Sequence, residues 1–396
     1  EAALGFPIEV IAGREEARLI YTGAAHALPT DGSHRLVVDI GGGSTECIVG
    51  ADYDADLLES AGVGCVSLSR RFFPEGAVDR NSFDHAYYAA RDVLAPIALA
   101  YRNHGWSYAV GTSGTAKALA QLAEANFGSD GLDRAALAAI EGALLKAGHA
   151  DRLRLEGLKA DRRPVLAGGL AVMSAVFDEL GIDRMRYCPA ALRQGVLYDL
   201  LGRSGGADVR ELTVAHMVRR YSADAAQGQR VADTALALFE QGARASAEEL
   251  AARRELLRWA ARLAEIGVSI AHEDFHKHSA YILSHADMPG FSQQEQRLMS
   301  TLALGHVGGL RKLRELVSSD LDWLMVLCLR VSSILHRRRE AQELPLPALF
   351  FKRRRVRIEV PRGWARSHPL SDETLASEAA TWNELGVFEE FAYERI

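Results

Sequence analysis

The segment Asp39–Glu46 combines two acidic side chains with a glycine turn and two hydroxyl groups. It contains the run Gly-Gly-Gly-Ser-Thr and lies between two short apolar stretches. Glycines permit positive φ angles and let a ligand approach the backbone closely, and successive N–H groups in such a turn bind phosphate oxygens. The carboxylates of Asp39 and Glu46 are oxygen donors of the kind that Mg²⁺ prefers, so we predict that both serve a magnesium ion. The predicted phosphate-binding residues of this turn are Gly41, Gly42, Gly43, Ser44 and Thr45.

A simpler interpretation of this segment is a β-hairpin whose glycines serve only the turn. A tight hairpin needs one or two glycines and no acidic neighbours. The third glycine and the two flanking acids of Asp39–Glu46 therefore favour a ligand-binding turn.

A second glycine turn, Gly111–Thr115, follows a predicted strand and opens a predicted helix. Unpaired N–H groups and the helix dipole attract anions at such a junction. A third glycine pair, Gly168-Gly169, is predicted to begin another helix in the same way. A tight turn explains any one of these glycine groups, but two serine- and threonine-rich turns together indicate a phosphate site. The predicted phosphate-binding residues of the second turn are Gly111, Ser113, Gly114 and Thr115.

Two glutamates, Glu15 and Glu16, stand in the first turn of a predicted helix. Acids in a first turn stabilise the helix dipole without any catalytic role. Alternatively, one of the two is a general base aimed at a water molecule beside the phosphate site, a role that contributes about 10²–10⁴-fold to a rate. The residues alone leave both hypotheses open.

The composition is that of an ordinary globular protein, with 396 residues, 48% hydrophobic and 25% charged. A net charge of −6 argues against a protein that binds nucleic acid through bulk charge. The four cysteines show no metal-binding spacing, and we expect buried thiols in a reducing cytoplasm. No apolar stretch reaches the length of a membrane span.

Hydrophobic periodicity predicts an α/β region in the first two hundred residues, then a mostly helical region, then a small α+β segment. The predicted domains are residues 1–202, 209–340 and 341–396, with a linker at Arg203–Ala207. The predicted strands are Glu9–Ala12, Arg35–Asp39, Glu46–Val49, Leu57–Gly62, Tyr108–Val110 and Met185–Cys188. The predicted helices are Glu15–Tyr21, Asp84–Asn103, Gly114–Ala125, Arg134–Lys146, Gly168–Leu180, Ala191–Leu201, Ala245–Glu265, Asp320–Arg338 and Ser371–Glu384, the last capped by Ser371.

Several of these motifs, in this order, resemble the exopolyphosphatase/guanosine pentaphosphate phosphatase (Ppx/GppA) family. Glu9–Ile20 is similar to its glutamate motif, Asp39–Glu46 to its phosphate loop, and Gly111–Thr115 with Lys117 to a later turn. The likeness continues at Gly168-Gly169-Leu170, Ala191–Tyr198, Leu257–Ala261, His278–Leu283 and Pro289–Phe291. It therefore covers nearly the whole chain, including the C-terminal half of the family's long form.

The resemblance implies a ribonuclease-H-like fold, of the actin/Hsp70/sugar-kinase type, followed by an all-helical HD-like domain and a small α+β cap. It implies an exopolyphosphatase that releases terminal phosphate from inorganic polyphosphate with Mg²⁺, and it makes Glu16 the catalytic base. Removal of the 5′-phosphate of guanosine pentaphosphate (pppGpp) is the alternative within the family. A non-catalytic polyphosphate or nucleotide sensor is a more distant one, and a homodimer is expected.

The chain departs from the family in two places that bear on function. Nothing matches the family's first phosphate loop, so we expect an N-terminal segment to be missing and the fragment alone to be inactive. An HD site needs an adjacent His-Asp pair, but Leu263–Gly267 stands at that place. A histidine cluster lies nearby, for which we expect solvated side chains and no metal. Its members are His272, His276, His278 and His285.

Two basic runs remain. Such runs usually form a solvated face, but they could also line a track for a long polyanion. The candidate residues of this polyphosphate track are Arg337, Arg338, Arg339, Lys352, Arg353 and Arg354.

Overall fold

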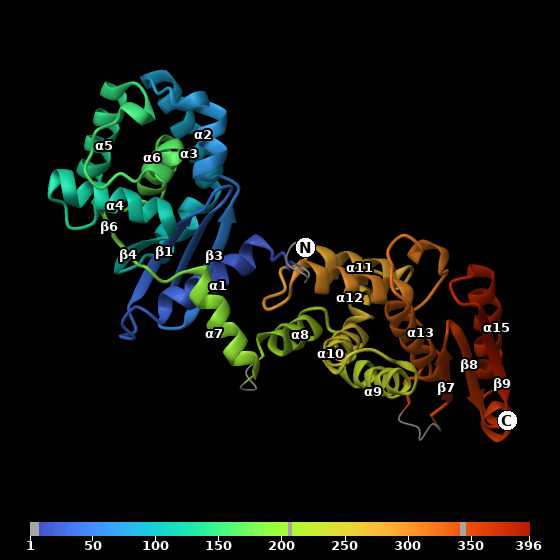
Figure 1. Ribbon diagram of the computed structural model, residues 1–396. Coiled ribbons are helices and arrows are strands. Elements are labelled where there is room, and N and C mark those ends of the chain that lie inside the picture. The colour runs from blue at the N-terminus through green and yellow to red at the C-terminus, as the bar shows by residue number, and fades with distance from the viewer. Residues whose placement is uncertain (1–7, 205–207, 341–345) are drawn as a thin grey trace. The chain divides into compact units, whose positions relative to one another are not determined.

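The computed structural model describes residues 8–204, 208–340 and 346–396. The chain divides into two compact units (Figure 1). The first runs from Ile11 to Asp208, and the second contains Val209–Ile396 together with the segment that ends at Val10. The predicted linker includes residues 205–207, which lie outside the described residues. The predicted division into three domains stays a prediction.

A six-stranded sheet in the order β3-β2-β1-β4-β6-β5 forms the centre of the first unit. Strands β1, β4 and β6 are parallel, whereas β2, β3 and β5 each run antiparallel to a neighbour. The strands are β1 (His34–Ile40), β2 (Thr45–Ala51), β3 (Asp54–Ala61), β4 (Tyr108–Thr112), β5 (Leu132–Asp133) and β6 (Arg184–Tyr187).

Helices cover both faces of this sheet (Figure 1). Alternate residues of a strand point to opposite faces, so Leu36 and Val38 join the core under one helical layer while Val37 joins the other. Five helices pack on the first face: α2 (Cys65–Phe72), α3 (Arg80–His104), α4 (Ser113–Phe127), α5 (Arg134–Ala147) and α6 (Arg163–Leu180). The other face carries α1 (Gly13–Ala25) and α7 (Leu192–Ser204), which pack against each other.

The sequence predicted five of the six strands of this sheet, but it placed one strand wrongly and missed the short β5 and one helix. Residues Glu9–Ala12 are irregular rather than a strand. Ile8 and Val10 expose their side chains, so the segment has no apolar face to bury in a sheet. Its carbonyls instead accept hydrogen bonds, such as the 2.8 Å bond from the N–H of Gln293 to Val10. Helix α2, which follows Gly62-Val63-Gly64, was not predicted.

The glycine pair Gly168-Gly169 does not begin a helix. Helix α6 starts at Arg163, and the pair lies buried inside it. A Cβ at Gly168 would lie 2.5 Å from the Ser69 hydroxyl and would also collide with the carbonyl of Cys65. The glycine therefore allows α6 to pack directly on α2, and the predicted turn at this pair is wrong.

The second unit is a helical array with a three-stranded sheet, β7-β8-β9. Helices and sheet share one hydrophobic core that includes Trp259, Phe291 and Trp382. The helices are α8 (Val209–Arg220), α9 (Ala225–Gly242), α10 (Ala247–Leu263), α11 (Phe275–His285), α12 (Gln293–Gly305), α13 (Asp320–Leu335), α14 (Arg362–Ser367) and α15 (Pro369–Leu385). The strands are β7 (Ala348–Lys352), β8 (Arg355–Val360) and β9 (Glu390–Arg395).

The helical region and the alternating tail agree with the sequence prediction, except at the start of the last helix. Helix α15 begins at Pro369, and its N-cap residue is His368 rather than Ser371. Proline is favoured in a first helical turn because it lacks only an N–H that would be unpaired there. The likeness of this unit to an HD domain stays a prediction.

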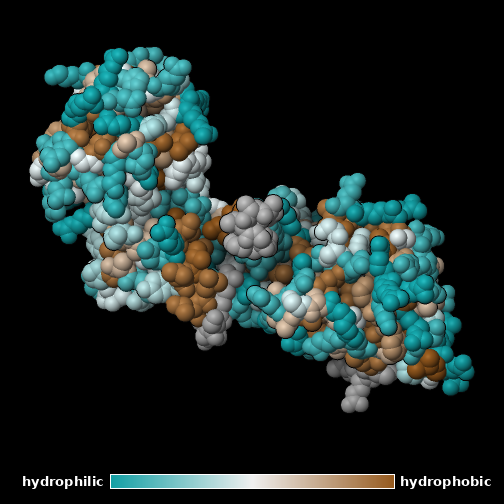
Figure 2. Space-filling view, in the orientation of Figure 1, coloured by the Kyte–Doolittle hydropathy of each residue, from teal (hydrophilic) through white to brown (hydrophobic). Residues whose placement is uncertain are grey.

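Apolar side chains are exposed on α7, among them Leu197 and Leu201, and Figure 2 shows an apolar area over this helix. In the part of the chain that the structure describes, no helix has both the length and the apolar character to cross a membrane. All four cysteines are free and buried, as predicted.

We predict opposite effects for two Gly-to-Ala substitutions inside helices. Gly168→Ala should lower the free energy of unfolding by about 1–3 kcal/mol, because the added methyl group overpacks the contact between α6 and α2. Gly142→Ala in α5 is the matched control. A Cβ there meets nothing within 4 Å, and alanine should stabilise this helix by roughly 0.5–1 kcal/mol. Urea unfolding of both variants measures the difference, and equal effects would contradict the proposed close contact.

Candidate active site

The two glycine turns lie side by side because β1 and β4 are parallel neighbours. Both turns follow the carboxyl ends of their strands, and Asp39 pairs with Thr112 across the ladder. The Thr112 hydroxyl donates a 2.7 Å hydrogen bond to the Asp39 carboxylate. The hydroxyls of Ser113 and Thr115 donate to the carbonyl of Ile40 at 3.0 and 3.2 Å. The start of α4 is therefore fastened to the beginning of the first glycine turn.

The start of α2 packs against the first glycine turn and holds it in place. The N–H of Gly41 closes the turn by donating to the Ser44 carbonyl at 2.9 Å, and the Gly42 carbonyl accepts from the N–H of Val66 at 2.9 Å. A Cβ at Gly64 would lie 2.5 Å from Gly42, so only glycine allows this approach. Gly42 and Gly43 are exposed, which leaves this part of the turn open to a ligand.

Three carboxylates gather beside these turns, on the face of the sheet that α1 covers. Asp39 and Glu46 are partners across the β1–β2 ladder, so their Cβ atoms are about 5 Å apart. The Ser60 hydroxyl donates a 2.8 Å hydrogen bond to Glu46 and lies against Gly13, the first residue of α1. Helix α1 thereby brings Glu16 close enough to interact electrostatically with both acids.

The two glutamates of α1 have different surroundings. Arg18 donates two hydrogen bonds to Glu15, at 2.8 and 2.7 Å, and a third to Asp199 of α7 at 2.6 Å. Glu15 is therefore a buried structural partner of Arg18, and Arg18 joins α1 to α7. Glu16 instead faces the negative charges of Asp39 and Glu46, so the geometry favours Glu16 as the reactive one of the pair.

Burial and mutual repulsion raise the pKa values of this acid trio, by which we mean Glu16, Asp39 and Glu46. Burial raises the pKa of Glu46 to about 7, against hydrogen bonds from Ser60 and Ser44 that lower it. Burial is also the main cause of the raised pKa of Asp39, and burial followed by the charge of Asp39 raises the pKa of Glu16. Such a donor set fits a divalent cation.

Arg162, which sequence reasoning missed, lies beside the N-terminus of α4. A Cβ at Gly114 would lie 2.6 Å from the Arg162 guanidinium carbon, so this cation lies over the first turn of α4. Ser113, in that same turn, has a φ of +65°, a conformation that is uncommon for a residue with a side chain. A guanidinium and helix N–H groups together form a site for phosphate. In the sequence, Arg162 is only a basic residue just before a helix, and nothing local connects it with Gly114.

The two predicted basic runs lie in the second unit and are mostly paired with other groups. Arg339 donates to Glu265 at 2.7 Å, and Arg337 donates to Thr374 at 2.9 Å. Arg353 and Arg354 form the turn between β7 and β8, both with positive φ. A cavity of about 650 Å³ beside this hairpin is lined by four basic and three acidic residues: Lys352, Arg353, Arg355, Arg357, Glu389, Glu390 and Glu394. The polyphosphate track stays a prediction.

The histidine cluster of the second unit is spread over a loop and α11. His276 is buried, and burial lowers its pKa. His272 and His285 are exposed, and His285 bonds to the carbonyl of Tyr281 at 2.9 Å and stacks on its ring.

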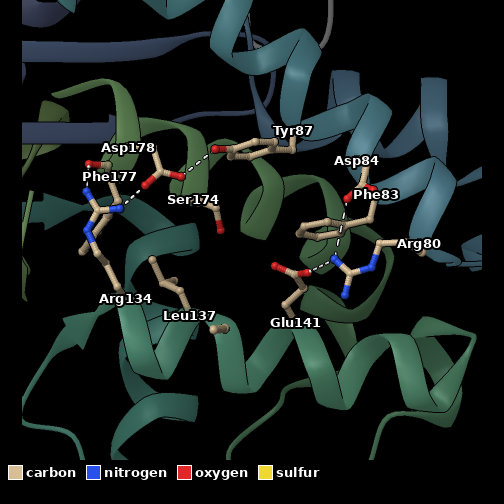
Figure 3. Close-up of a pocket in the computed structure, with 11 residues that line it drawn as sticks. Arg80, Phe83, Asp84, Tyr87, Arg134, Leu137, Glu141, Ser174, Phe177 and Asp178 are labelled. Atoms are coloured by element: carbon tan, nitrogen blue, oxygen red, sulfur yellow. Dashed lines mark hydrogen bonds and ion pairs between the residues drawn. The ribbon is translucent and has the colours of Figure 1, made fainter. Parts of the chain in front are cut away.

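A separate cavity of about 300 Å³ lies between α3, α5 and α6 (Figure 3). Its charged side chains are paired with one another: Arg134 contacts Asp178, and Arg80 contacts Glu141 and lies 3.6 Å from Asp84. None of the acid trio lines it. We therefore place the candidate active site at the glycine turns rather than here.

Comparison with known proteins identifies the family. The family model described as "Ppx/GppA phosphatase family" matches residues 1–204, and "Ppx/GppA phosphatase, domain III" matches residues 209–379. A curated relative from Pseudoalteromonas translucida (strain TAC 125) is 36% identical over 389 residues, which is 98% of this chain and 78% of that protein. Its name is guanosine-5′-triphosphate,3′-diphosphate pyrophosphatase.

Two solved structures match parts of the chain. An exopolyphosphatase from Cytophaga hutchinsonii is 23% identical with a TM-score of 0.43, and covers 50% of this chain and 66% of its own. A Ppx/GppA phosphatase from Aquifex aeolicus is 22% identical with a TM-score of 0.42, with the same coverage. The two family models, which follow one another along almost the whole sequence, together with the curated relative, show that the chain is a hydrolase and belongs to the Ppx/GppA phosphatase family.

Proposed function

We propose that this chain removes the 5′-terminal phosphate of guanosine pentaphosphate by in-line attack of water. The observation that carries the proposal is the meeting of two glycine turns and three carboxylates at one edge of the sheet. The terminal phosphoryl group binds at the turns, and the acid trio binds metal and activates water. The charges of the groups explain both roles, phosphate binding by the turns and metal binding by the acid trio.

The glycine turns meet the negative charge of the phosphoryl oxygens. The N–H groups of the exposed residues Gly42 and Gly43, the N-terminus of α4 and the guanidinium of Arg162 are all electropositive. Catalysis of phosphoryl transfer depends mainly on positioning and on such electrostatic stabilisation. A fixed set of donors costs no reorganisation when charge develops on the oxygens.

The acid trio supplies the metal ligands and the base. Asp39 and Glu46 are the proposed ligands of Mg²⁺, which would neutralise repulsion among the three carboxylates. Glu16 is the proposed base that takes the proton from the attacking water. Its raised pKa brings it closer to the operating pH, where general base catalysis is most effective.

The curated relative supports pppGpp as the substrate in preference to polyphosphate. The relative's name specifies a nucleotide bearing a 5′-triphosphate and a 3′-diphosphate, and the match extends over nearly the whole chain. The ion pairs of the basic runs leave fewer cations for a long polyanion. Inorganic polyphosphate is the second candidate substrate, because the hairpin of β7 and β8 still presents Arg353 beside a cavity.

We predict that pppGpp and long-chain polyphosphate are hydrolysed with different efficiency. The assay measures phosphate release with each substrate, using the chain together with any coding sequence that precedes Glu1. A kcat/KM at least tenfold higher for pppGpp supports the proposal. A preference for polyphosphate would replace pppGpp by the second candidate, and no release from either substrate would contradict both.

Replacement of Glu16 by glutamine should remove the base but leave the fold intact. We expect Glu16→Gln to lower kcat by about 10²–10⁴-fold, in the range that positioned base catalysis contributes. Glu124→Gln, at an exposed position of the same unit, is the matched control and should keep the wild-type rate. An unchanged rate for Glu16→Gln would exclude this residue from the mechanism.

Stability without metal should depend on pH through Glu46. Because its pKa rises from 4.5 in the unfolded chain to about 7 in the fold, this carboxyl lowers stability as the pH rises from about 4.5 to about 7. Glu46→Gln keeps the acceptor for Ser60 and cannot ionise. It should therefore gain stability over wild type by roughly 3 kcal/mol at pH 8, and nothing at pH 4.

The same experiment tests the metal site. Millimolar Mg²⁺ at pH 8 should stabilise the wild type more than Glu46→Gln, because binding to the folded state is linked to unfolding. Urea unfolding with and without Mg²⁺ measures both effects. An equal response to Mg²⁺ in the two proteins would place the metal away from Glu46.

A further inference from the structure

Two histidines and an aspartate converge at the end of β1 that lies opposite to the acid trio. They are His34, the first residue of β1, Asp56 of β3 and His104, the last residue of α3. Their ligand atoms all lie within 4.8 Å of one another. His34 and Asp39 are five residues apart on one strand, so the two clusters are about 17 Å apart along it.

Two of the three distances in this cluster match those between ligands on a single metal ion. His34 Nε2 lies 3.2 Å from Asp56 Oδ2, and His104 Nε2 lies 3.5 Å from the same oxygen. Zn²⁺ binds histidine nitrogen and carboxylate oxygen at about 2.0–2.1 Å, which places two ligands of a tetrahedron about 3.3–3.4 Å apart. The three side chains could therefore receive the ion with little movement.

A hydrogen bond fixes the tautomer of His104 that metal binding requires. Its Nδ1 lies 3.1 Å from the carbonyl of Gly105, and a carbonyl can only accept. Nδ1 therefore carries a proton, and Nε2, 3.5 Å from the Asp56 carboxylate, is the nitrogen left to bind a metal. Bonds of this kind orient metal-ligating histidines in proteins and raise their basicity.

A β-bulge directs Asp56 into the cluster. Gly50 pairs with Ala55 and Val49 pairs with Leu57, so Asp56 is an extra residue on β3. Ala55 and Leu58 both contact the core on the α1 side, although they are three positions apart. The bulge therefore leaves Asp56 on the same side as Leu57, where α3 ends, in keeping with the general role of bulges in redirecting side chains.

From this geometry we infer that His34, Asp56 and His104 form a surface site for a divalent transition metal, best matched by Zn²⁺, with water as the fourth ligand. Two imidazoles and one carboxylate suit Zn²⁺ better than Mg²⁺, which prefers oxygen ligands alone. The ion would join β1, β3 and the end of α3, and its expected role is to stabilise the first unit. It differs in ligands and position from the proposed magnesium site.

Titration of Zn²⁺ into metal-free protein tests the inference directly. The titration is done by calorimetry in millimolar Mg²⁺, which fills the site at Asp39 and Glu46, and Co²⁺ absorption reports a four-coordinate nitrogen and oxygen environment. We expect one Zn²⁺ per chain. His34→Gln, Asp56→Asn and His104→Gln should each weaken binding at least tenfold, since each removes one of three ligands.

Two controls separate this site from others. His85→Gln removes an exposed histidine from α3 itself and should bind Zn²⁺ like wild type, as should Asp39→Asn. Zn²⁺ at about a hundredfold excess over Kd should also raise the melting temperature of wild type by roughly 5 °C, but not that of the three ligand variants. Absence of binding, or a loss of binding in Asp39→Asn, would overturn the inference and leave the cluster as a His–Asp ion-pair group.

The outcome is independent of the proposed hydrolase reaction. We expect each variant to fold, because all three residues are exposed and none belongs to the candidate active site. Circular dichroism checks this. In Mg²⁺ alone, the three variants should hydrolyse pppGpp at the wild-type rate. A loss of activity with retained Zn²⁺ binding would contradict the assignment of these side chains to a separate metal site.

Discussion

Repulsion among two buried carboxylates and a half-buried one is the constraint on which the candidate active site depends. Glu16, Asp39 and Glu46 come from a helix and two strands, and burial raises the pKa of each. A fold does not hold such a group together for stability, since each charge disfavours the others. The packing of the surrounding elements must outweigh this repulsion until a cation neutralises it. Stored repulsion of this kind is typical of functional sites.

Hydroxyl groups and close backbone contacts hold the acids in place. Thr112 and Ser60 each donate to one carboxylate, while Gly13 and Gly64 let α1 and α2 approach the site without a side chain between. The Arg18 contacts to Glu15 and Asp199 then fasten α1 to α7. Rigid support of this sort is what a reacting water molecule requires, because small displacements of a base or a ligand lower the rate strongly.

Strand β1 carries different chemistry at its two ends. Its carboxyl end leads into the phosphate turn and the oxygen ligands, whereas its amino end carries His34 beside Asp56 and His104. The same strand ladder fixes both groups, since pairing with β2 and β4 sets the register of every residue between them. A metal ion at the amino end would therefore stabilise the strand that positions Asp39.

The sequence alone determined those features of this protein that depend on residues close together in the chain, namely most strands, the long helices and the turn at Asp39–Glu46. Period-two and helical patterns identified five of the strands of the first unit, and Asp39–Glu46 fixed two acids across one turn because a short turn makes its flanking residues cross-strand partners. Family resemblance singled out Glu16 as the base, but the local pattern was equally consistent with Glu15 in that role. Only packing distinguishes them, since it pairs Glu15 with Arg18 and places Glu16 near Asp39 and Glu46.

Tertiary structure decided whatever depends on residues far apart in the chain. Gly168 has the sequence context of a turn, yet its role is set by the backbone of α2, about a hundred residues earlier. Arg162 reaches the start of α4, and Asp56 reaches two histidines, through contacts and a bulge that leave no periodic trace in the sequence. Local patterns report hydrogen bonding and burial within an element, whereas the meeting of elements depends on side-chain packing over the whole unit.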